Sequence, residues 1–129
     1  MKNITGIHHV AMICNGEENF NETMKFYRDI LGLEVVRVWD NGQSVMLDTG
    51  AGLLEIFANG KDRLGEGALR HIAFTVEDTD ACLEAVRAAG YTVTMEPTDV
   101  VIKSEFPYPA RIAFCIGPVG ETVEFFHVK

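Results

Sequence analysis

Two histidines and two glutamates stand at repeated positions in this sequence, and their side chains are the best suited to carry chemistry. His9 lies in the run IHHVAMI and His71 in the run LRHIAFTV, both apolar and rich in β-forming residues. Glu55 lies in LLEIF and Glu124 in TVEFF, each between apolar neighbours. A buried carboxylate needs a cation, a hydrogen-bond partner or a shifted pKa. Imidazole and carboxylate groups together suit a divalent Zn, Ni, Co, Mn or Fe ion.

Strand alternation predicts which way these side chains point. Successive side chains of a strand face opposite sides of the sheet, so a Val10 that packs against a helix leaves His9 on the other face. The same alternation separates His71, Glu55 and Glu124 from their apolar neighbours. If the sheets curl into a cup, these four residues meet around one divalent ion, and octahedral coordination leaves two positions for water or substrate. A polar pocket without metal is the alternative.

The other two histidines are predicted to have no role as ligands. His8 and His127 fall on the strand faces opposite the proposed site. His8 is adjacent to His9, and His127 is an odd number of residues from Glu124, so each points to the other side of its strand. We expect His8 to be a neighbour of the site only and His127 to be solvated near the end of the chain.

A helix follows each histidine-containing strand. The first is predicted over Phe20–Leu31, with Asn19 or Asn21 as its cap and Gly32 as its end, because apolar residues recur with a period close to 3.6. The second is predicted over Thr79–Ala89, with Thr79 or Asp80 near the cap and Gly90 as its end.

Three strand-like runs follow each helix, separated by the turn signals DNG, GAG and GPVG. The first three are LEVVRVW, SVMLDTG and LLEIFA, and the second three are YTVTM, ARIAFCIG and TVEFFHV. The chain therefore predicts an α+β fold in which two tandem βαβββ modules form a cup-shaped mixed sheet with helices outside. We expect one domain over residues 1–129, with module 1 at about 1–59 and module 2 at about 68–129.

Two segments break the repeat. The stretch PTDVVIKSEFPYPA makes the second module longer, and its prolines predict an irregular flap in which Lys103 is a candidate to close over a substrate. The glycine-rich and charged stretch ANGKDRLGEGA is predicted to be the hinge between the modules.

Composition excludes several classes of partner. The formal net charge is −8, from 19 acidic and 11 basic residues, which disfavours nucleic acid and anionic membranes. The three cysteines have wide spacings and no CxxC motif, which indicates reduced thiols in the cytoplasm. No stretch reaches the roughly 18 apolar residues of a membrane span.

These runs together resemble the vicinal oxygen chelate superfamily, which includes glyoxalase I, methylmalonyl-CoA epimerase, extradiol dioxygenases, fosfomycin-resistance proteins and bleomycin-resistance proteins. The resemblance covers essentially the whole chain and is carried by HVAMI, KFYRDILGLEVV, LLEIF, LRHIAFTV and GPVGETVEFF. It implies metal ligation by His9, Glu55, His71 and Glu124. It also implies a Lewis-acid metal that stabilises an enediolate, a glutamate that moves a proton, and a homodimer.

The resemblance leaves several readings open. Four ligands favour a glyoxalase I-like lyase or isomerase acting on a small carbonyl or hydroxy-carbonyl substrate, with Glu124 slightly preferred over Glu55 as the base. A bleomycin-resistance-type protein that binds a small molecule without turnover, an epimerase-like member or a dioxygenase are the alternatives. Bacterial glyoxalase I has an arginine four residues after the first ligand histidine, where this chain has Ile13, and this departure argues against glutathione as the thiol.

Further residues are candidates to line the site and contact the substrate. Some share a strand face with a candidate ligand, and others are cationic or aromatic. The candidates are Phe57, Thr75, Phe126, Arg37, Trp39 and Arg111.

Overall fold

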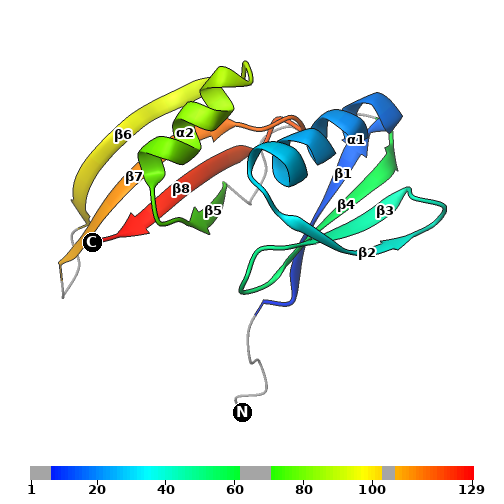
Figure 1. Cartoon of the computed structure of the whole chain (residues 1–129), viewed down its shortest axis with the longest axis horizontal. Helices are drawn as coiled ribbons and strands as arrows, with labels where there is room; N and C mark the ends of the chain where they lie inside the picture. Colours follow the sequence, from blue (N-terminus) through cyan, green and yellow to red (C-terminus); the bar gives the residue numbers. More distant parts are fainter. Residues whose placement is uncertain (1–6, 62–70, 103–106) are drawn as a thin grey trace, which may run out of the picture. The chain divides into compact units, whose positions relative to one another are not determined.

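The structure is a computed structural model that describes residues 7–61, 71–102 and 107–129. Its contacts divide the chain into two compact units, unit 1 at Met1–Arg63 and unit 2 at Leu64–Lys129. Each unit contains one four-stranded mixed sheet (Figure 1).

Unit 1 has the order β-α-β-β-β that the sequence predicts. Its elements are β1 (His9–Asn15), α1 (Gly16–Met24), the π-helical continuation η1 (Lys25–Ile30), β2 (Glu34–Trp39), β3 (Ser44–Asp48) and β4 (Leu53–Gly60). The strands lie in the order β1-β4-β3-β2, with β1 parallel to β4 and the other neighbours antiparallel.

Unit 2 repeats this topology. Its elements are β5 (Ile72–Thr75), α2 (Thr79–Ala88), β6 (Val93–Ile102), β7 (Tyr108–Ile116) and β8 (Thr122–Val128). The strands lie in the order β5-β8-β7-β6, and β5 is parallel to β8. The prediction of two tandem βαβββ modules in an α+β fold is therefore confirmed. The closure of the two sheets into a common cup stays a prediction.

Both predicted helix ends are confirmed. Gly32 and Gly90 have φ angles of +75° and +90°, a left-handed conformation that glycine adopts without steric cost. The backbone N–H of Leu33 donates to the carbonyl of Tyr27, and that of Tyr91 donates to the carbonyl of Val86. These bonds satisfy carbonyls that the helix itself leaves unpaired.

The predicted helix starts need correction. α1 begins at Gly16, before the predicted Phe20, and its cap is Asn15. Asn19 lies inside the helix, where its side-chain oxygen accepts a hydrogen bond of 2.9 Å from the backbone N–H of Asn15. The cap of α2 is Asp78, one residue before the predicted positions, and its carboxylate accepts from the N–H of Ala81.

Each helix covers one face of its own sheet. α1 contacts β1 and β4, and α2 contacts β6, β7 and β8. Leu54 and Ile56 of β4 are almost completely buried, as are Val123 and Phe125 of β8. Each large apolar side chain buried in this way contributes roughly 1.5–3 kcal/mol to folding. The apolar neighbours of both glutamates therefore form the helix-covered face.

The irregular flap predicted for PTDVVIKSEFPYPA is wrong over most of its length. β6 continues to Ile102 and β7 begins at Tyr108, so the described part of this segment is a β-ladder. Pro97 is tolerated because β6 is an edge strand and its register shifts between Met95 and Thr98. Lys103 and most of the predicted hinge lie outside the described residues.

The part of the chain that the structure describes contains no helix with the length and apolar character needed to cross a membrane.

Candidate metal centre

In unit 1, His9 and Glu55 lie on the sheet face opposite α1. The parallel pairing of β1 with β4 places Ala11 beside Glu55, and His9 shares the face of Ala11. His9 Nε2 is 4.0 Å from Glu55 Oε2. Glu55 is only 8% exposed, so its carboxylate is held mostly away from water.

Unit 2 contains the equivalent pair. Ala73 of β5 pairs with Glu124 of β8, and His71 directly precedes β5 on the same face. His71 Nε2 is 3.0 Å from Glu124 Oε2, and Glu124 is 7% exposed. The ring of Phe114 meets that of His71 edge to face, with centroids 5.6 Å apart. The two repeats thus present the same histidine–glutamate pair.

The electrostatics of Glu124 follow from this burial. Desolvation raises the pKa of the Glu124 carboxyl, and the nearby imidazole of His71 opposes this with a smaller lowering effect. The protein therefore holds a carboxylate whose charge is only partly compensated. A cation bound at this position would supply the missing compensation.

The donor atoms of both pairs fit a divalent ion. Two ligand atoms that each bind one ion at about 2.1 Å lie roughly 3.0–3.4 Å apart. The His71–Glu124 separation matches this value, and the His9–Glu55 separation needs to close by less than about 1 Å. Within the described ranges no three or more His, Cys, Asp or Glu side chains gather as a metal cluster, and each unit presents one histidine–glutamate pair.

Three of the predicted substrate contacts lie on the sheet face of unit 1 that carries His9 and Glu55, which we call its ligand face. Strand register forms one row across the sheet, from Ala11 through Glu55 and Met46 to Arg37. The next row on this face runs from Ile13 through Phe57 and Ser44 to Trp39. Arg37, Trp39 and Phe57 thus share the face of His9.

Thr75 and Phe126 lie on the ligand face of unit 2, which is the sheet face that carries His71 and Glu124. They are paired directly across β5 and β8. Phe126 also stacks on Tyr108, with ring centroids 5.7 Å apart and planes inclined by 27°. Sequence reasoning missed Tyr108. Its even spacing from Phe114 along β7 is the signal that places it on this face.

The structure does not bring Arg111 to the candidate site. Arg111 pairs with His127 across β7 and β8, on the face that α2 covers. Its Nε and Nη2 atoms donate to the carboxylate of Asp80 at 2.6 and 2.8 Å, and Nη1 lies 3.2 Å from Asp99. Arg111 therefore ties α2 to β6 and β7.

The remaining histidines differ from their predicted surroundings. His8 does not point away from the site, because its Nδ1 atom is 2.9 Å from Nδ1 of His9. His127 lies on the helix-covered face as predicted, but its Nδ1 atom is 2.9 Å from the carbonyl oxygen of Val76 and it is only half-exposed.

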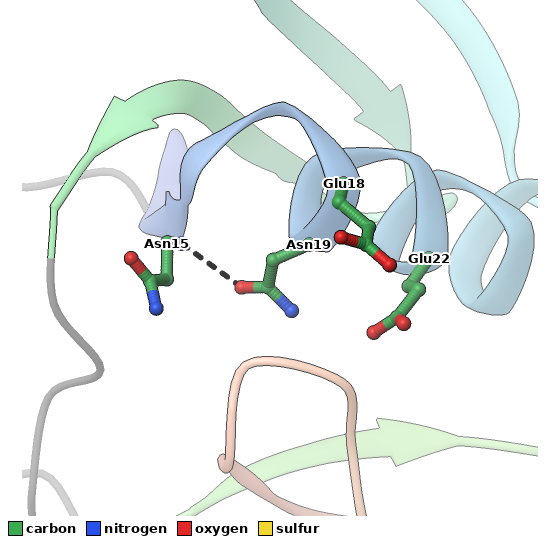
Figure 2. A pocket seen from close by; sticks show the side chains of 4 residues that line it. All are labelled: Asn15, Glu18, Asn19 and Glu22. Carbon is green, nitrogen blue, oxygen red and sulfur yellow. Dashed lines mark hydrogen bonds between the residues drawn. The ribbon is translucent and has the colours of Figure 1, made fainter.

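A separate hollow lies on α1 and contains none of the predicted ligands. Figure 2 shows its lining residues Asn15, Glu18, Asn19 and Glu22, with the hydrogen bond between Asn15 and Asn19 drawn as a dashed line. Asn15, Glu18 and Glu22 are exposed, and the buried Asn19 already accepts a hydrogen bond from the backbone N–H of Asn15, so we assign no site to these groups.

Comparison with known proteins identifies relatives along most of the chain. The chain is 33% identical to a lactoylglutathione lyase from Haemophilus influenzae over 121 residues, which cover 86% of each protein. A solved lactoylglutathione lyase from Agrobacterium tumefaciens superposes with a TM-score of 0.68 at 19% identity, over 98% of this chain and 96% of that one. A glyoxalase/dioxygenase from Nostoc punctiforme gives a TM-score of 0.74 at 16% identity, over 98% and 93%. These two structures share the fold.

The family assignment comes from the sequence itself. The family model described as Glyoxalase/Bleomycin resistance protein/Dioxygenase superfamily matches residues 6–125, a span that includes all four candidate ligands. The chain therefore belongs to the glyoxalase/bleomycin resistance protein/dioxygenase superfamily, as its repeated modules predict.

Proposed function

We propose that this protein is a metal-dependent lyase or isomerase of the glyoxalase type that acts on a small carbonyl or hydroxy-carbonyl substrate. The observation that carries the proposal is the repeated pair of a histidine Nε2 atom and a buried glutamate, at 4.0 Å in unit 1 and 3.0 Å in unit 2. The similarity to a lactoylglutathione lyase supports the same class of reaction.

His9, Glu55, His71 and Glu124 would hold one divalent ion of the Zn, Ni, Co, Mn or Fe type. The ion, when bound, would polarise the carbonyl oxygen of the substrate. The proposal requires one pair from each unit to serve the same ion, either within one chain or between the chains of a homodimer. The retained ligands argue against a protein that only sequesters a small molecule.

Glu124 is the residue that we assign as the base. It would take the proton from the carbon next to the substrate carbonyl, while the electron pair of that C–H bond moves toward the carbonyl oxygen. It would then deliver the proton to the former carbonyl carbon, while the hydroxyl proton of the first carbon passes to the adjacent oxygen, so that the first carbon becomes the new carbonyl. Burial raises the pKa of Glu124, so its carboxylate is a stronger base than an ordinary glutamate once it leaves the ion.

The residues around the ligands indicate the kind of substrate. Ile13 and Phe57 are neighbours on the ligand face of unit 1, and Thr75 and Phe126 are neighbours on that of unit 2. Ile13 supplies no charge for an anionic tripeptide, so we propose a thiol adduct other than that of glutathione, or a free hydroxy-carbonyl compound. The structure joins none of Cys14, Cys82 and Cys115 in a disulfide, which fits a cytoplasmic enzyme.

Metal analysis combined with activity profiling tests this function. The natively purified protein should contain stoichiometric divalent metal and should turn over hemithioacetals in preference to epimerisable thioesters or catechols. Metal removal should abolish the activity, and one of the five candidate ions should restore it. A protein that binds small molecules but contains no metal after native purification would instead be of the sequestering type.

A further inference from the structure

We propose that Arg37 binds a carboxylate on the substrate, in a part remote from the reacting carbonyl. This inference rests on the proposed function, because it names the class of substrate that the same site would take. It starts from the position of Arg37 on the ligand face, which neither the family assignment nor the ligand set requires.

Strand register places Arg37 in line with a candidate ligand. Arg37 pairs with Met46, and Met46 pairs with Glu55. Neighbouring strands lie about 4.8 Å apart, so the Cα atoms of Arg37 and Glu55 are separated by roughly 10 Å. A substrate with its carbonyl beside Glu55 and a carboxylate a few bonds away would span this distance.

A β-bulge brings Arg37 onto this face. The register shifts between Val35 and Arg37, because Val36 is an extra residue in β2. Without that shift Val36 would pair with Met46, and Arg37 would face the opposite side. β6 of unit 2 has a matching shift between Val93 and Met95.

The comparison between the two repeats shows what is particular to Arg37. In unit 2 the equivalent row runs from Glu124 through Phe114 to Met95, so an apolar side chain occupies the position of Arg37. Both modules have the bulge, but only in unit 1 is the residue after it a cation. Because Met95 occupies the same position in unit 2, the bulge itself does not require an arginine.

The other described arginines each form an ion pair with a carboxylate, and Arg37 differs from them in this respect. Arg28 pairs with Asp29, Arg87 with Glu84 and Glu96, and Arg111 with Asp80 and Asp99. Arg37 is exposed and has no ion-pair partner among the residues that the structure describes, although the chain carries 19 acidic residues. Its planar guanidinium group is suited to a bidentate bond with a carboxylate.

Trp39 provides a direct readout of binding at this position. It is the only tryptophan of the chain and lies two residues from Arg37 on the same face. Fluorescence of Trp39 can therefore follow a ligand that occupies the ligand face, whether or not the ligand reacts.

The test uses two pairs of compounds that differ only in a carboxylate. The reactive pair consists of the hemithioacetals of methylglyoxal with 3-mercaptopropionate and with 3-mercaptopropanol. The unreactive pair consists of the corresponding S-(2-oxopropyl) thioethers, whose binding is followed by Trp39 fluorescence. We expect the wild-type, metal-loaded protein to prefer the carboxylate compound about tenfold in both kcat/KM and Kd, and added salt to reduce this preference.

Variants identify the residue responsible. Arg37→Gln should bring the preference to about onefold by weakening the carboxylate compound, and Arg37→Lys should keep part of the preference. Arg28→Gln removes the same charge from a paired arginine in η1 and should retain the preference. Equal binding of both thioethers by the wild type, or a preference that persists in Arg37→Gln, would overturn the inference. A preference in binding without turnover would uphold the role of Arg37 while the proposed reaction fails.

Discussion

The Nδ1 atoms of His8 and His9 lie 2.9 Å apart, so one imidazole must donate to the other. If His9 donates from Nδ1, its Nε2 atom keeps a free lone pair on the side of Glu55, where a metal would bind. Ligand histidines are commonly oriented by such a bond from the second ring nitrogen. In the second repeat the position equivalent to His8 is Arg70, so the sequence does not repeat this pair.

The first prediction concerns the tautomer of His9. In His8→Phe the acceptor nitrogen is lost while an aromatic ring is kept, so metal affinity should fall about 10–100-fold, the cost of losing an outer-shell partner. In the metal-free protein the nitrogen chemical shifts of His9 should move from the Nδ1–H form toward the Nε2–H form. Chelator competition and NMR spectroscopy measure the two effects.

His8→Asn is the matched control, because an amide oxygen can still accept a hydrogen bond from Nδ1 of His9. It should retain most of the affinity. If His8→Phe and His8→Asn bind metal as tightly as the wild type does, His8 does not orient His9.

The second prediction concerns the ligands themselves. His9→Ala, Glu55→Ala, His71→Ala and Glu124→Ala should each reduce metal affinity by more than the roughly 10–100-fold effect of an outer-shell change. Glu55→Gln should be milder than Glu55→Ala, because an amide oxygen can still coordinate. His127→Ala is the control, since His127 lies on the helix-covered face and bonds to the carbonyl of Val76. Isothermal titration with each candidate ion gives the comparison.

The third prediction separates stability from function at Glu124. Because burial raises the pKa of this carboxyl in the folded protein, its ionised form opposes folding at pH values above the ordinary glutamate range. Glu124→Gln should therefore stabilise the metal-free protein at pH 7 and lose that advantage near pH 3. The same variant should reduce turnover more than metal content. Urea unfolding at both pH values is the measurement, and a destabilised apo variant at pH 7 would contradict the assignment.

Much of the fold and the two histidine–glutamate pairs could be predicted from sequence because both depend on local patterns. Alternation around Glu55 and Glu124 fixes their strand face, and Gly32 and Gly90 end the helices through their own conformational freedom. These signals need no knowledge of tertiary contacts.

The errors arose where distant contacts decide the outcome. Arg111 was expected at the substrate, but Asp80 on α2 holds it on the opposite face, and nothing local in the sequence marks that partner. Pro97 was expected to break the strand, but an edge position with a register shift accommodates it. His8 precedes β1, so strand alternation does not determine its direction.

The fourth prediction concerns Gly60, which pairs with Asn15 just past an irregularity in the register between β1 and β4. A Cβ atom at this position would overlap the carbonyl oxygen of Cys14, so the two strands approach closely only because residue 60 is glycine. Gly60→Ala should destabilise the protein by about 1–3 kcal/mol. It should also weaken metal binding, because the parallel pairing of β1 with β4 holds His9 beside Glu55. Asn59→Ala, an exposed change one residue away, should affect neither in denaturant unfolding and metal titration.

The last prediction uses the ion pairs of Arg111. The pKa of Asp80 is lowered mainly by its hydrogen bond with Arg111, and that of Asp99 by hydrogen bonds with Lys129 and then Arg111. A carboxyl whose pKa is lower in the folded state stabilises the protein above its unfolded pKa of about 3.9, and this contribution disappears as the pH falls through the folded value. Arg111→Gln should therefore destabilise the protein at pH 7, and its difference from the wild type should shrink below about pH 4.

Arg28→Gln is the control for that measurement. Asp29 is adjacent to Arg28 in the chain, so their interaction can persist in the unfolded state, whereas Arg111 joins β7 to residues 31 positions away in α2 and 12 positions away in β6. Urea unfolding at pH 7, 5 and 3 should show a pH-dependent loss for Arg111→Gln and a much smaller one for Arg28→Gln. A loss that is the same at all three pH values would mean that Arg111 stabilises the fold by packing of its side chain and not through its two carboxylates.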